Sequence, residues 1–264
     1  MTVLSRSKGD KLVELNKIYN IDIMDGLRDL SENSVDLIVT SPPYNVGIDY
    51  DSWNDSAPAD LYFQWDHEWL TGCWYALKDD GRIAINIPYE VNFKKSGDGR
   101  CFILSEYYQM MKSIGFKFAG IVDLKEIQAH RVKLTAWGSW LSPSAPYIYN
   151  PKEAVLICYK RDWKKQTRGE SYFDGSPESK EEFKEFVFGE WSYRAQTAGK
   201  TKANFSLDIP EKAIKILSWK NDLVLDPFMG SGTTAVACKK LGRRYIGFDI
   251  SPEYCRVANE RINS

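Results

Sequence analysis

The chain has 264 residues, of which 43% are hydrophobic and 27% are charged, and its formal net charge is −1. This composition excludes a wholly disordered protein, and the length allows one large α/β domain with insertions or two small domains. The near-neutral charge argues against a protein that coats nucleic acid, but it does not exclude DNA binding through a local basic face.

Cysteine usage and the lengths of the apolar runs indicate the cellular compartment. The five cysteines are widely spaced and include no Cys-x-x-Cys pair, which favours buried thiols in a reducing compartment over a metal site or a disulfide framework. No apolar run approaches the ~20 residues of a membrane span, and residues 1–8 lack the apolar core of a signal peptide. We therefore expect a cytoplasmic protein that contacts no membrane and holds no metal.

Strands and helices alternate along most of the chain. Short apolar runs bounded by turn residues predict strands, and apolar residues at helical spacing predict helices. The predicted strands span residues 17–22, 35–39, 82–88, 116–124, 153–159, 222–226 and 244–249. The predicted helices span residues 25–30, 60–77, 101–114, 208–219, 235–241 and 252–262. We expect strands 116–124 and 153–159 to pair antiparallel, residues 1–15 to form a loose arm, and residues 46–58 to form a flexible loop.

The stretch from Thr40 to Asn45, Thr-Ser-Pro-Pro-Tyr-Asn, follows the predicted strand 35–39 directly. In open parallel sheets, ligands bind at this carboxyl edge of the strands. The two prolines fix φ and lack N–H donors, so we expect their carbonyls to point outward as unpaired acceptors beside the ring of Tyr44. Acceptors beside a flat aromatic face suit an amino group on a planar ring. An ordinary proline-stiffened loop is the alternative.

Polar loops in the middle of the chain are candidates for contact with a polymeric substrate. Lys94 and Lys95 lie in a glycine-containing loop, which is either solvated or in contact with phosphates. Between strands 116–124 and 153–159, Arg131, Trp137 and Trp140 mix basic and aromatic side chains. Such a loop either receives a flipped base or packs its tryptophans onto the domain.

Residues 160–202 are the most polar section of the chain and carry dense charge of both signs. A near balance of charge is typical of a surface insertion, so we expect one here. Basic residues gather at the start of the section, and recognition of a polymeric substrate is expected there. They are Lys160, Arg161, Lys164, Lys165 and Arg168.

A second motif begins where the strand 222–226 ends in Asp226 and continues through a glycine turn into a helix. Gly230 and Gly232 allow close approach of a ligand to the backbone, and the helix start offers free N–H groups, which together form the usual cradle for an adenosine-containing cofactor. A side chain at either glycine would occupy the space of the cofactor. A phosphate-binding P-loop is the rival, but no lysine follows the glycines. Asp249 lies where an acid holds ribose hydroxyls.

The two motifs and their order resemble the DNA amino-methyltransferases of the permuted beta group, in which the catalytic motif precedes the cofactor motif. The resemblance extends from Ile18 to Ile262. It implies one α/β domain, residues 1–264, built on a Rossmann-like sheet of about seven strands with an antiparallel pair. It also implies S-adenosylmethionine as cofactor, and residues 160–202 would be a target-recognition insertion within the domain.

The resemblance also assigns roles to individual residues. Ser41 and Pro42, followed by Pro43, would accept hydrogen bonds from the target amine through a hydroxyl and a carbonyl, and Tyr44 would stack on an extruded base. The residues that would bind the cofactor belong to the second motif and its neighbours. They are Asp22, Phe205, Asp226, Pro227, Phe228, Gly230, Ser231, Gly232, Thr233, Thr234, Asp249 and Ile250.

Serine at position 41 implies methylation of the cytosine N4 amine, because in this family aspartate there usually accompanies adenine N6. Methylation of a ring carbon would need a cysteine nucleophile, commonly after proline, and the chain has no Pro-Cys pair. The expected partner is double-stranded DNA, within a restriction-modification system and with a homodimer as one option. Adenine-N6 methylation, action on RNA or protein, and an inactive binding subunit are the alternatives.

Overall fold

The computed structural model describes residues 3–4, 13–48, 55–127, 143–146, 148, 150–166, 177–194 and 205–263. Within them, the centre is an eight-stranded sheet of order β10-β8-β9-β5-β4-β11-β12-β3. Most neighbours are parallel, and β9 runs antiparallel to both β5 and β8. The predicted sheet with its antiparallel pair is confirmed. The strands are β3 (Lys17–Asn20), β4 (Val35–Thr40), β5 (Leu77–Pro88), β8 (Lys117–Glu126), β9 (Glu153–Tyr159), β10 (Glu190–Tyr193), β11 (Leu223–Asp226) and β12 (Arg244–Asp249).

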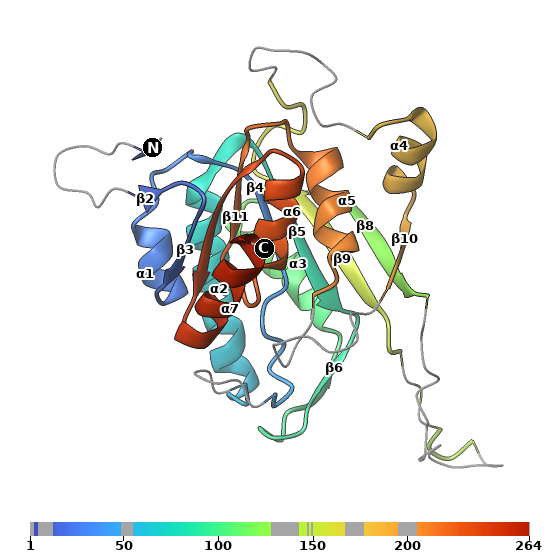
Figure 1. Ribbon diagram of the computed structural model, residues 1–264. Coiled ribbons are helices and arrows are strands. Elements are labelled where there is room, and N and C mark those ends of the chain that lie inside the picture. Colours follow the sequence, from blue (N-terminus) through green and yellow to red (C-terminus); the bar gives the residue numbers. More distant parts are fainter. Residues whose placement is uncertain are drawn as a thin grey trace.

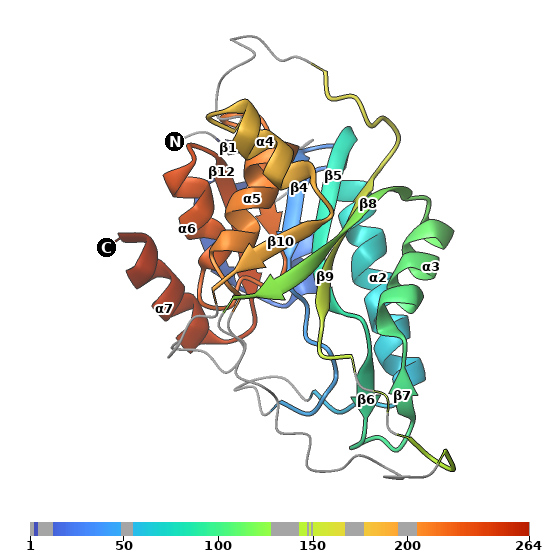
Figure 2. The same ribbon diagram turned by 90° about the vertical axis from the view of Figure 1, so that its right-hand side faces the viewer.

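Helices cover both faces of the sheet, giving three layers (Figure 2). One face packs against α1 (Ile23–Arg28), α2 (Ala59–Ala76) and α3 (Ile103–Ile114). The other packs against α5 (Asp208–Leu217), α6 (Thr233–Lys240) and α7 (Pro252–Asn263). Because side chains alternate along a strand, Ile38 of β4 enters the first core and Leu37 the second. Burial on both faces explains why the central strands are almost continuously apolar.

Two segments that the sequence predicted to be irregular contain short strands. The expected loose arm, residues 1–15, contains β1 (Val3–Leu4), which pairs antiparallel with β2 (Val13–Glu14). The expected loop around Lys94 is a hairpin of β6 (Val91–Phe93) and β7 (Gly99–Cys101), whose turn uses the positive φ of Gly97. Short strands of this kind depend on pairing partners that periodicity does not reveal.

Residues 160–202 contribute to the sheet. The helix α4 (Lys180–Val187) and the strand β10 lie in this section, and Figure 1 shows β10 at the edge of the sheet beside β8. Trp191 of β10 is 1% exposed, and its indole N–H donates to the Phe186 carbonyl at 2.8 Å. At least this part of the section therefore belongs to the core.

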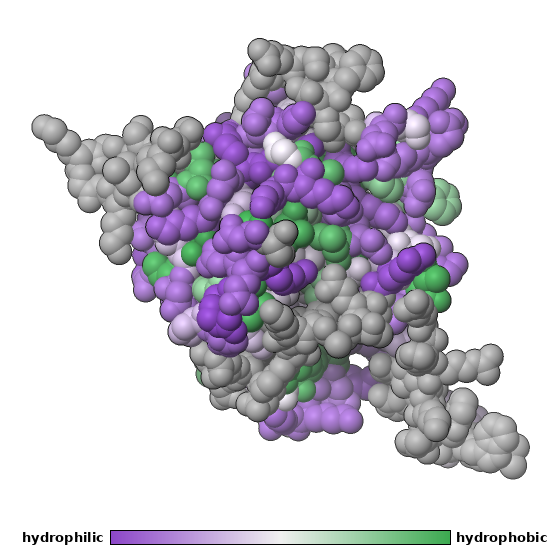
Figure 3. Space-filling view, viewed as in Figure 1, coloured by the Kyte–Doolittle hydropathy of each residue, from purple (hydrophilic) through white to green (hydrophobic). Residues whose placement is uncertain are grey.

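The surface is largely polar. The face seen in Figure 3 shows mostly hydrophilic side chains, with apolar ones in small separate groups. Of the described helices, none is both long enough and apolar enough to cross a membrane.

Candidate active site

The carboxyl edge of the sheet brings the two sequence motifs together. The strands β4 and β11 are parallel neighbours, so the Thr-Ser-Pro-Pro-Tyr loop and the Asp226 turn leave the sheet side by side. A cavity of about 300 Å³ lies between them. It is lined by Ser41, Pro42, Tyr44, Ile48, Asn86, Glu153, Phe205, Asp226, Phe228, Met229, Gly230, Ser231 and Thr233.

Asp226 joins the two motifs through hydrogen bonds. It accepts from the Thr40 hydroxyl at 2.7 Å and from the Thr234 hydroxyl at 2.6 Å, and the Phe228 N–H donates to it at 3.1 Å. The carboxyl group is 2% exposed, and burial raises its pKa to about 6 although these three donors favour the charged form. The carboxylate therefore fixes the catalytic loop relative to the first turn of α6.

The Ser41 hydroxyl belongs to a network that crosses the cavity wall. Its oxygen lies 2.8 Å from the Tyr44 hydroxyl, which donates to the Asn86 carbonyl at 3.1 Å. The Asn86 amide donates to Tyr44 at 3.0 Å and to Glu153 at 2.6 Å. Burial raises the pKa of Glu153, and the hydrogen bond from Asn86 opposes this shift. The network fixes the Tyr44 ring at the cavity.

The two proline carbonyls differ from each other. The Pro43 carbonyl accepts a hydrogen bond from the Tyr62 hydroxyl at 2.9 Å, and Pro43 does not line the cavity. The prediction that both carbonyls are unpaired and point outward is therefore wrong for Pro43, because α2 supplies a buried donor. Pro42 lines the cavity, and none of the described residues donates a hydrogen bond to its carbonyl.

The glycines of the second motif serve different purposes. Both have positive φ, 51° at Gly230 and 81° at Gly232, which explains the residue type. A Cβ at Gly232 would lie 2.8 Å from the Cβ of Ala258 in α7, whereas at Gly230 the nearest atom is 3.9 Å away. The expectation that a side chain at either position fills the cofactor space therefore does not hold for Gly232, where it would meet a helix.

Arg261 of α7 supports the same turn. Its guanidinium donates to the Ser231 carbonyl at 2.7 Å, to the Ser231 hydroxyl at 2.6 Å and to the Thr233 hydroxyl at 3.2 Å. These contacts hold the turn that begins α6, and both Ser231 and Thr233 line the cavity. The sequence analysis did not select Arg261, which lies in the closing helix.

The other residues expected at the cofactor lie at the neighbouring strand ends. Asp22 caps α1 by accepting from the Met24 N–H at 2.8 Å. Asp249 accepts from the N–H groups of Gly230 and Ser251, both at 2.8 Å, and burial raises its pKa. Ile250 is 42% exposed. Of this expected set, Phe205, Asp226, Phe228, Gly230, Ser231 and Thr233 line the cavity, whereas Asp22, Pro227, Gly232, Thr234, Asp249 and Ile250 lie outside its lining.

The residues present fit S-adenosylmethionine, the expected cofactor. The acids Asp226 and Asp249 form no ion pair with another described residue, so a positively charged ligand would meet uncompensated negative charge. The Phe228 ring is held by edge contact with Trp69, with ring centroids 5.1 Å apart, and offers an apolar wall. Within the described part of the chain, no group of three or more His, Cys, Asp or Glu could hold a metal ion.

The loop after Tyr44 is shaped by a buried acid. Asp55, which is 2% exposed, accepts hydrogen bonds from four successive backbone N–H groups, those of residues 45–48, at 2.8–3.1 Å. Lys95 of the β6–β7 turn donates to the Gly47 carbonyl at 2.7 Å. Lys94 and Lys95 are exposed, and the contact with Gly47, which precedes the cavity residue Ile48, places this turn on the cavity side of the molecule.

The described basic residues that directly follow β9, those of residues 160–166, do not line the cavity. Lys160 is 3% exposed and donates to Asn33 and to the Leu77 carbonyl. Lys165 is 8% exposed and pairs with Asp222 at 3.0 Å. The prediction that these two lysines contact phosphates is wrong, because their ammonium groups are used inside the protein.

Arg161 and Lys164 are exposed. However, β9 is antiparallel to β5, so the segment after it lies at the amino edge, the side opposite to the cavity; it rises to the top of Figure 2. The other residues predicted to contact DNA lie outside the described residues. They are Arg131, Trp137, Trp140 and Arg168.

Asn86 and Glu153 are cavity residues that the sequence analysis missed. Asn86 is a polar residue near the carboxyl end of an apolar strand, and this pattern was the available signal. Glu153 begins β9, and the antiparallel register places it opposite Pro88 at the same edge. Its position follows from pairing that no local pattern specifies.

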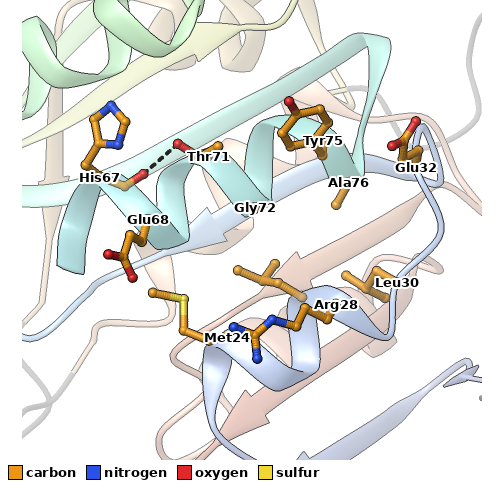
Figure 4. A pocket seen from close by; sticks show the side chains of 11 residues that line it. Met24, Arg28, Leu30, Glu32, His67, Glu68, Thr71, Gly72, Tyr75 and Ala76 are labelled. Carbon is orange, nitrogen blue, oxygen red and sulfur yellow. Dashed lines mark hydrogen bonds between the residues drawn. The ribbon is translucent and has the colours of Figure 1, made fainter. Parts of the chain in front are cut away.

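A second cavity, of about 540 Å³, lies between α1 and α2 (Figure 4). Met24 and Arg28 of α1 face His67, Glu68 and other residues of α2 across it. None of the residues of the two sequence motifs lines this cavity. Its larger volume therefore does not make it the site.

Comparison with known proteins agrees with this geometry. A family model, N6_N4_Mtase, described as DNA methylase, matches residues 35–260. The type II methyltransferase M.MjaVI of Methanocaldococcus jannaschii is 39% identical over 185 residues, which cover 69% of this chain and 90% of that protein.

Two solved structures share the fold. The Thermus thermophilus protein TTHA0409, complexed with S-adenosyl-L-methionine, superimposes with a TM-score of 0.71 at 23% identity, covering 93% of this chain and 92% of that one. The cytosine-N4-specific PvuII DNA methyltransferase gives a TM-score of 0.69 at 19% identity, with 92% and 85% covered. The chain belongs to the N6_N4_Mtase family of DNA methylases, which use S-adenosylmethionine as the methyl donor.

Proposed function

We propose that the protein transfers a methyl group from S-adenosylmethionine to the exocyclic N4 amine of cytosine in double-stranded DNA, as the modification enzyme of a type II restriction-modification system. The observation that carries the choice of base is Ser41 at the cavity, at the position where the family usually has serine for cytosine N4 and aspartate for adenine N6. The type II name of M.MjaVI supports the restriction-modification setting.

Hydrogen-bond accounting supports Ser41 as the acceptor for the amine. Tyr44 has one hydroxyl proton; when it gives this proton to the Asn86 backbone carbonyl at 3.1 Å, the proton in the 2.8 Å contact between Ser41 and Tyr44 comes from Ser41. The Ser41 oxygen then offers only lone pairs to the cavity. Together with the Pro42 carbonyl, it provides two acceptors for the two protons of an amino group.

These two acceptors address the central difficulty of the reaction. The lone pair of an exocyclic amine is delocalised into the ring, which makes the amine a poor nucleophile. Accepting both N–H groups in fixed positions would turn the lone pair toward the methyl group, and holding the reactants in line supplies much of the remaining rate. When bound, the cofactor supplies an electrophilic methyl group on a sulfonium. As the nitrogen–carbon bond forms, the bond between the methyl carbon and the cofactor sulfur would break, leaving a neutral thioether, and the nitrogen would give up one proton to solvent.

Double-stranded DNA would approach the carboxyl edge of the sheet, with the target base extruded into the cavity beside Tyr44. The exposed Lys94 and Lys95 of the β6–β7 turn are the described basic residues that we assign to phosphate contacts, together with Arg131 from outside the described part. Trp137 and Trp140 remain candidates for contact with the flipped base. Residues 160–202 are proposed for target recognition through portions other than the buried lysines.

The product decides the proposal. DNA methylated by the protein is digested to nucleosides and weighed by mass spectrometry, with N4-methylcytosine as the expected product. Ser41→Ala should lose most turnover and keep cofactor affinity, because Ser41 touches the amine. N6-methyladenine as the sole product would show the assignment to be wrong and would establish the family's other reaction.

A further inference from the structure

A chain of buried oxygen atoms runs from the middle of α2 to the catalytic loop. The Asp66 carboxyl oxygen lies 2.9 Å from the Tyr107 hydroxyl, which lies 3.2 Å from the Tyr62 hydroxyl, which lies 2.9 Å from the Pro43 carbonyl oxygen. Asp66 and Tyr107 are fully buried, and Tyr62 is 2% exposed. Figure 2 shows α2 and α3, which carry these side chains, side by side on one face of the sheet.

This row of oxygen atoms contains three contacts, and three hydrogen bonds require three protons. Each tyrosine supplies one, and the Pro43 carbonyl supplies none. If Asp66 were ionised, one of the three contacts would contain no proton. All three contacts can be hydrogen bonds at once only if Asp66 supplies the third proton; it then donates to Tyr107, Tyr107 to Tyr62, and Tyr62 to Pro43.

The surroundings of Asp66 favour the neutral acid. No ion pair reaches it from the described residues, and its Oδ2 has no hydrogen-bond partner among them. The groups that face it are Trp69 and Tyr62 of α2 and Tyr107 of α3, and Asp55 adds negative charge near Tyr62. Burial raises the pKa of Asp66 to about 8, although hydrogen bonds from Trp69, Tyr107 and Tyr62 to a charged carboxylate would lower it, and burial also raises the pKa of both tyrosines.

We propose that Asp66 is a positioning residue that, as a neutral acid, completes this chain and holds the Pro43 carbonyl away from the cavity. With the proline φ angles fixed, a held Pro43 peptide leaves Ser41 and Pro42 as the loop's acceptors at the cavity. Asp66 also accepts from the Trp69 indole at 2.8 Å, and Trp69 packs against Phe228 on the cofactor side. One buried acid thus supports both halves of the site.

Three variants test this role by activity. In Asp66→Asn, the Oδ1 position is taken by either the amide oxygen or the amide nitrogen. The oxygen can accept from Trp69 but cannot donate to Tyr107, and the nitrogen can donate to Tyr107 but cannot accept from Trp69. Tyr62→Phe and Tyr107→Phe break single links. Each should lower kcat about three- to tenfold, the effect of one hydrogen bond, and the two tyrosine variants, which leave the Asp66–Trp69 contact intact, should keep KM for S-adenosylmethionine within about twofold of the wild type. Tyr108→Phe, on the neighbouring α3 residue that packs against Phe118, is the matched control and should retain wild-type kcat.

The pH profile separates positioning from mere support of the fold. The wild-type kcat should fall as the pH rises through about 8, where Asp66 loses its proton, and Asp66→Asn should lack this limb. A limb that persists in Asp66→Asn, or wild-type kcat in Tyr62→Phe, would overturn the proposal.

Thermal unfolding provides a readout that does not depend on activity. Because the folded pKa lies above the unfolded value, the native state keeps a proton that the unfolded chain releases, so stability should fall as the pH rises from about 4 to about 8. Asp66→Asn should flatten this dependence, and an unchanged slope would count against a neutral Asp66.

The inference rests on methyl transfer by the family and not on the choice of base. Activity is therefore followed as radioactive methyl incorporation into unmethylated DNA of varied sequence. An adenine product would overturn the cytosine assignment and leave the variant comparison valid. If the wild-type protein methylated no DNA, the proposed function would fail, and the unfolding profile would still decide the protonation of Asp66.

Discussion

Buried or half-buried acids lie at both edges of the central sheet, and their partners differ between the two edges. At the amino edge, Asp36 and Asp222 share Lys165, at 3.8 and 3.0 Å. At the carboxyl edge, Asp226 and Asp249 accept hydrogen bonds from hydroxyl and backbone N–H groups, and within the described ranges neither forms an ion pair. The amino edge is therefore electrostatically complete, whereas the carboxyl edge keeps negative charge for a ligand.

The pKa shifts follow the same division. Burial would raise the pKa of Asp36, but Lys165, Lys78 and the Leu223 N–H outweigh it and lower the pKa. At Asp226 no cation opposes burial, and the pKa rises to about 6. A buried acid with no cationic partner is costly to ionise, so we expect a positively charged ligand to bind beside it. S-adenosylmethionine, with its sulfonium, has the charge that the carboxyl edge lacks.

Removing the shared cation should produce the largest effect on stability. Lys165→Met leaves Asp222 without its ion pair in a buried setting, so the free energy of unfolding should fall by about 3–5 kcal/mol in denaturant titrations. Lys164→Met, at the exposed neighbour, should stay within about 0.5 kcal/mol of the wild type. A loss of DNA affinity without a loss of stability would show that Lys165 faces DNA after all.

The matching change at the carboxyl edge should affect cofactor binding. Asp226→Asn removes the charge and turns one acceptor toward Thr40 or Thr234 into a donor, so affinity for S-adenosylmethionine should fall roughly 10- to 100-fold, about 1.4–2.8 kcal/mol. Calorimetry measures the affinity. Asp222→Asn, at the amino edge, is the control and should bind the cofactor as the wild type does.

The wild-type affinity for the cofactor should also decrease as the pH falls through about 6, because Asp226 then becomes neutral. Asp226→Asn should lack this dependence. Equal pH profiles for the two proteins would locate the relevant charge on another residue.

The two glycines of the cofactor turn separate backbone strain from a steric clash. Gly230→Ala makes no steric clash, since the nearest atom to its Cβ is 3.9 Å away, but it keeps a positive φ, which costs about 1–2 kcal/mol. Gly232→Ala has the same strain and also meets Ala258, which adds about 1 kcal/mol or more of overpacking. Unfolding measurements should therefore show that Gly232→Ala is the less stable of the two variants. Calorimetry should show that Gly230→Ala loses more cofactor affinity relative to the stability that it loses.

Local patterns predicted the strands of the central sheet other than β10, and both motif loops, because a strand end and a glycine turn are encoded by adjacent residues. The antiparallel partner of β8 was also predicted, since β9 is a strongly apolar run. Lys160 and Lys165 were wrongly predicted to contact phosphates, because the sequence of a polar stretch does not distinguish a buried lysine from an exposed one. The available signal was Asp36, an acid inside an apolar strand that requires a buried cation.

The missed site residues act across elements. Tyr62 reaches Pro43 from α2, and Glu153 reaches Asn86 from a strand 67 positions away in the sequence. Contacts of this kind depend on how α2 and β9 pack on the sheet, which periodicity does not specify. The sequence therefore predicted the two loops that meet at the candidate site, but it did not reveal the residues that hold these loops in place.

The smallest expected effect is on DNA binding, and we expect opposite results for substitutions at the two edges of the sheet. Lys94 and Lys95 are exposed on the cavity side, so replacing both with Ala should reduce the salt-dependence slope of log affinity by about 1.8, or 0.9 for each phosphate contact. The loss of affinity itself should be modest at physiological salt, because exposed charges are screened.

Arg161 and Lys164 are the matched pair at the amino edge, and their double replacement should leave the slope unchanged, since DNA bound over the cavity would not reach them. Binding titrations over a range of salt concentrations measure both slopes. If the slope fell only in the Arg161 and Lys164 variant, DNA would bind the amino edge, and the cavity at the opposite edge could not receive its target base.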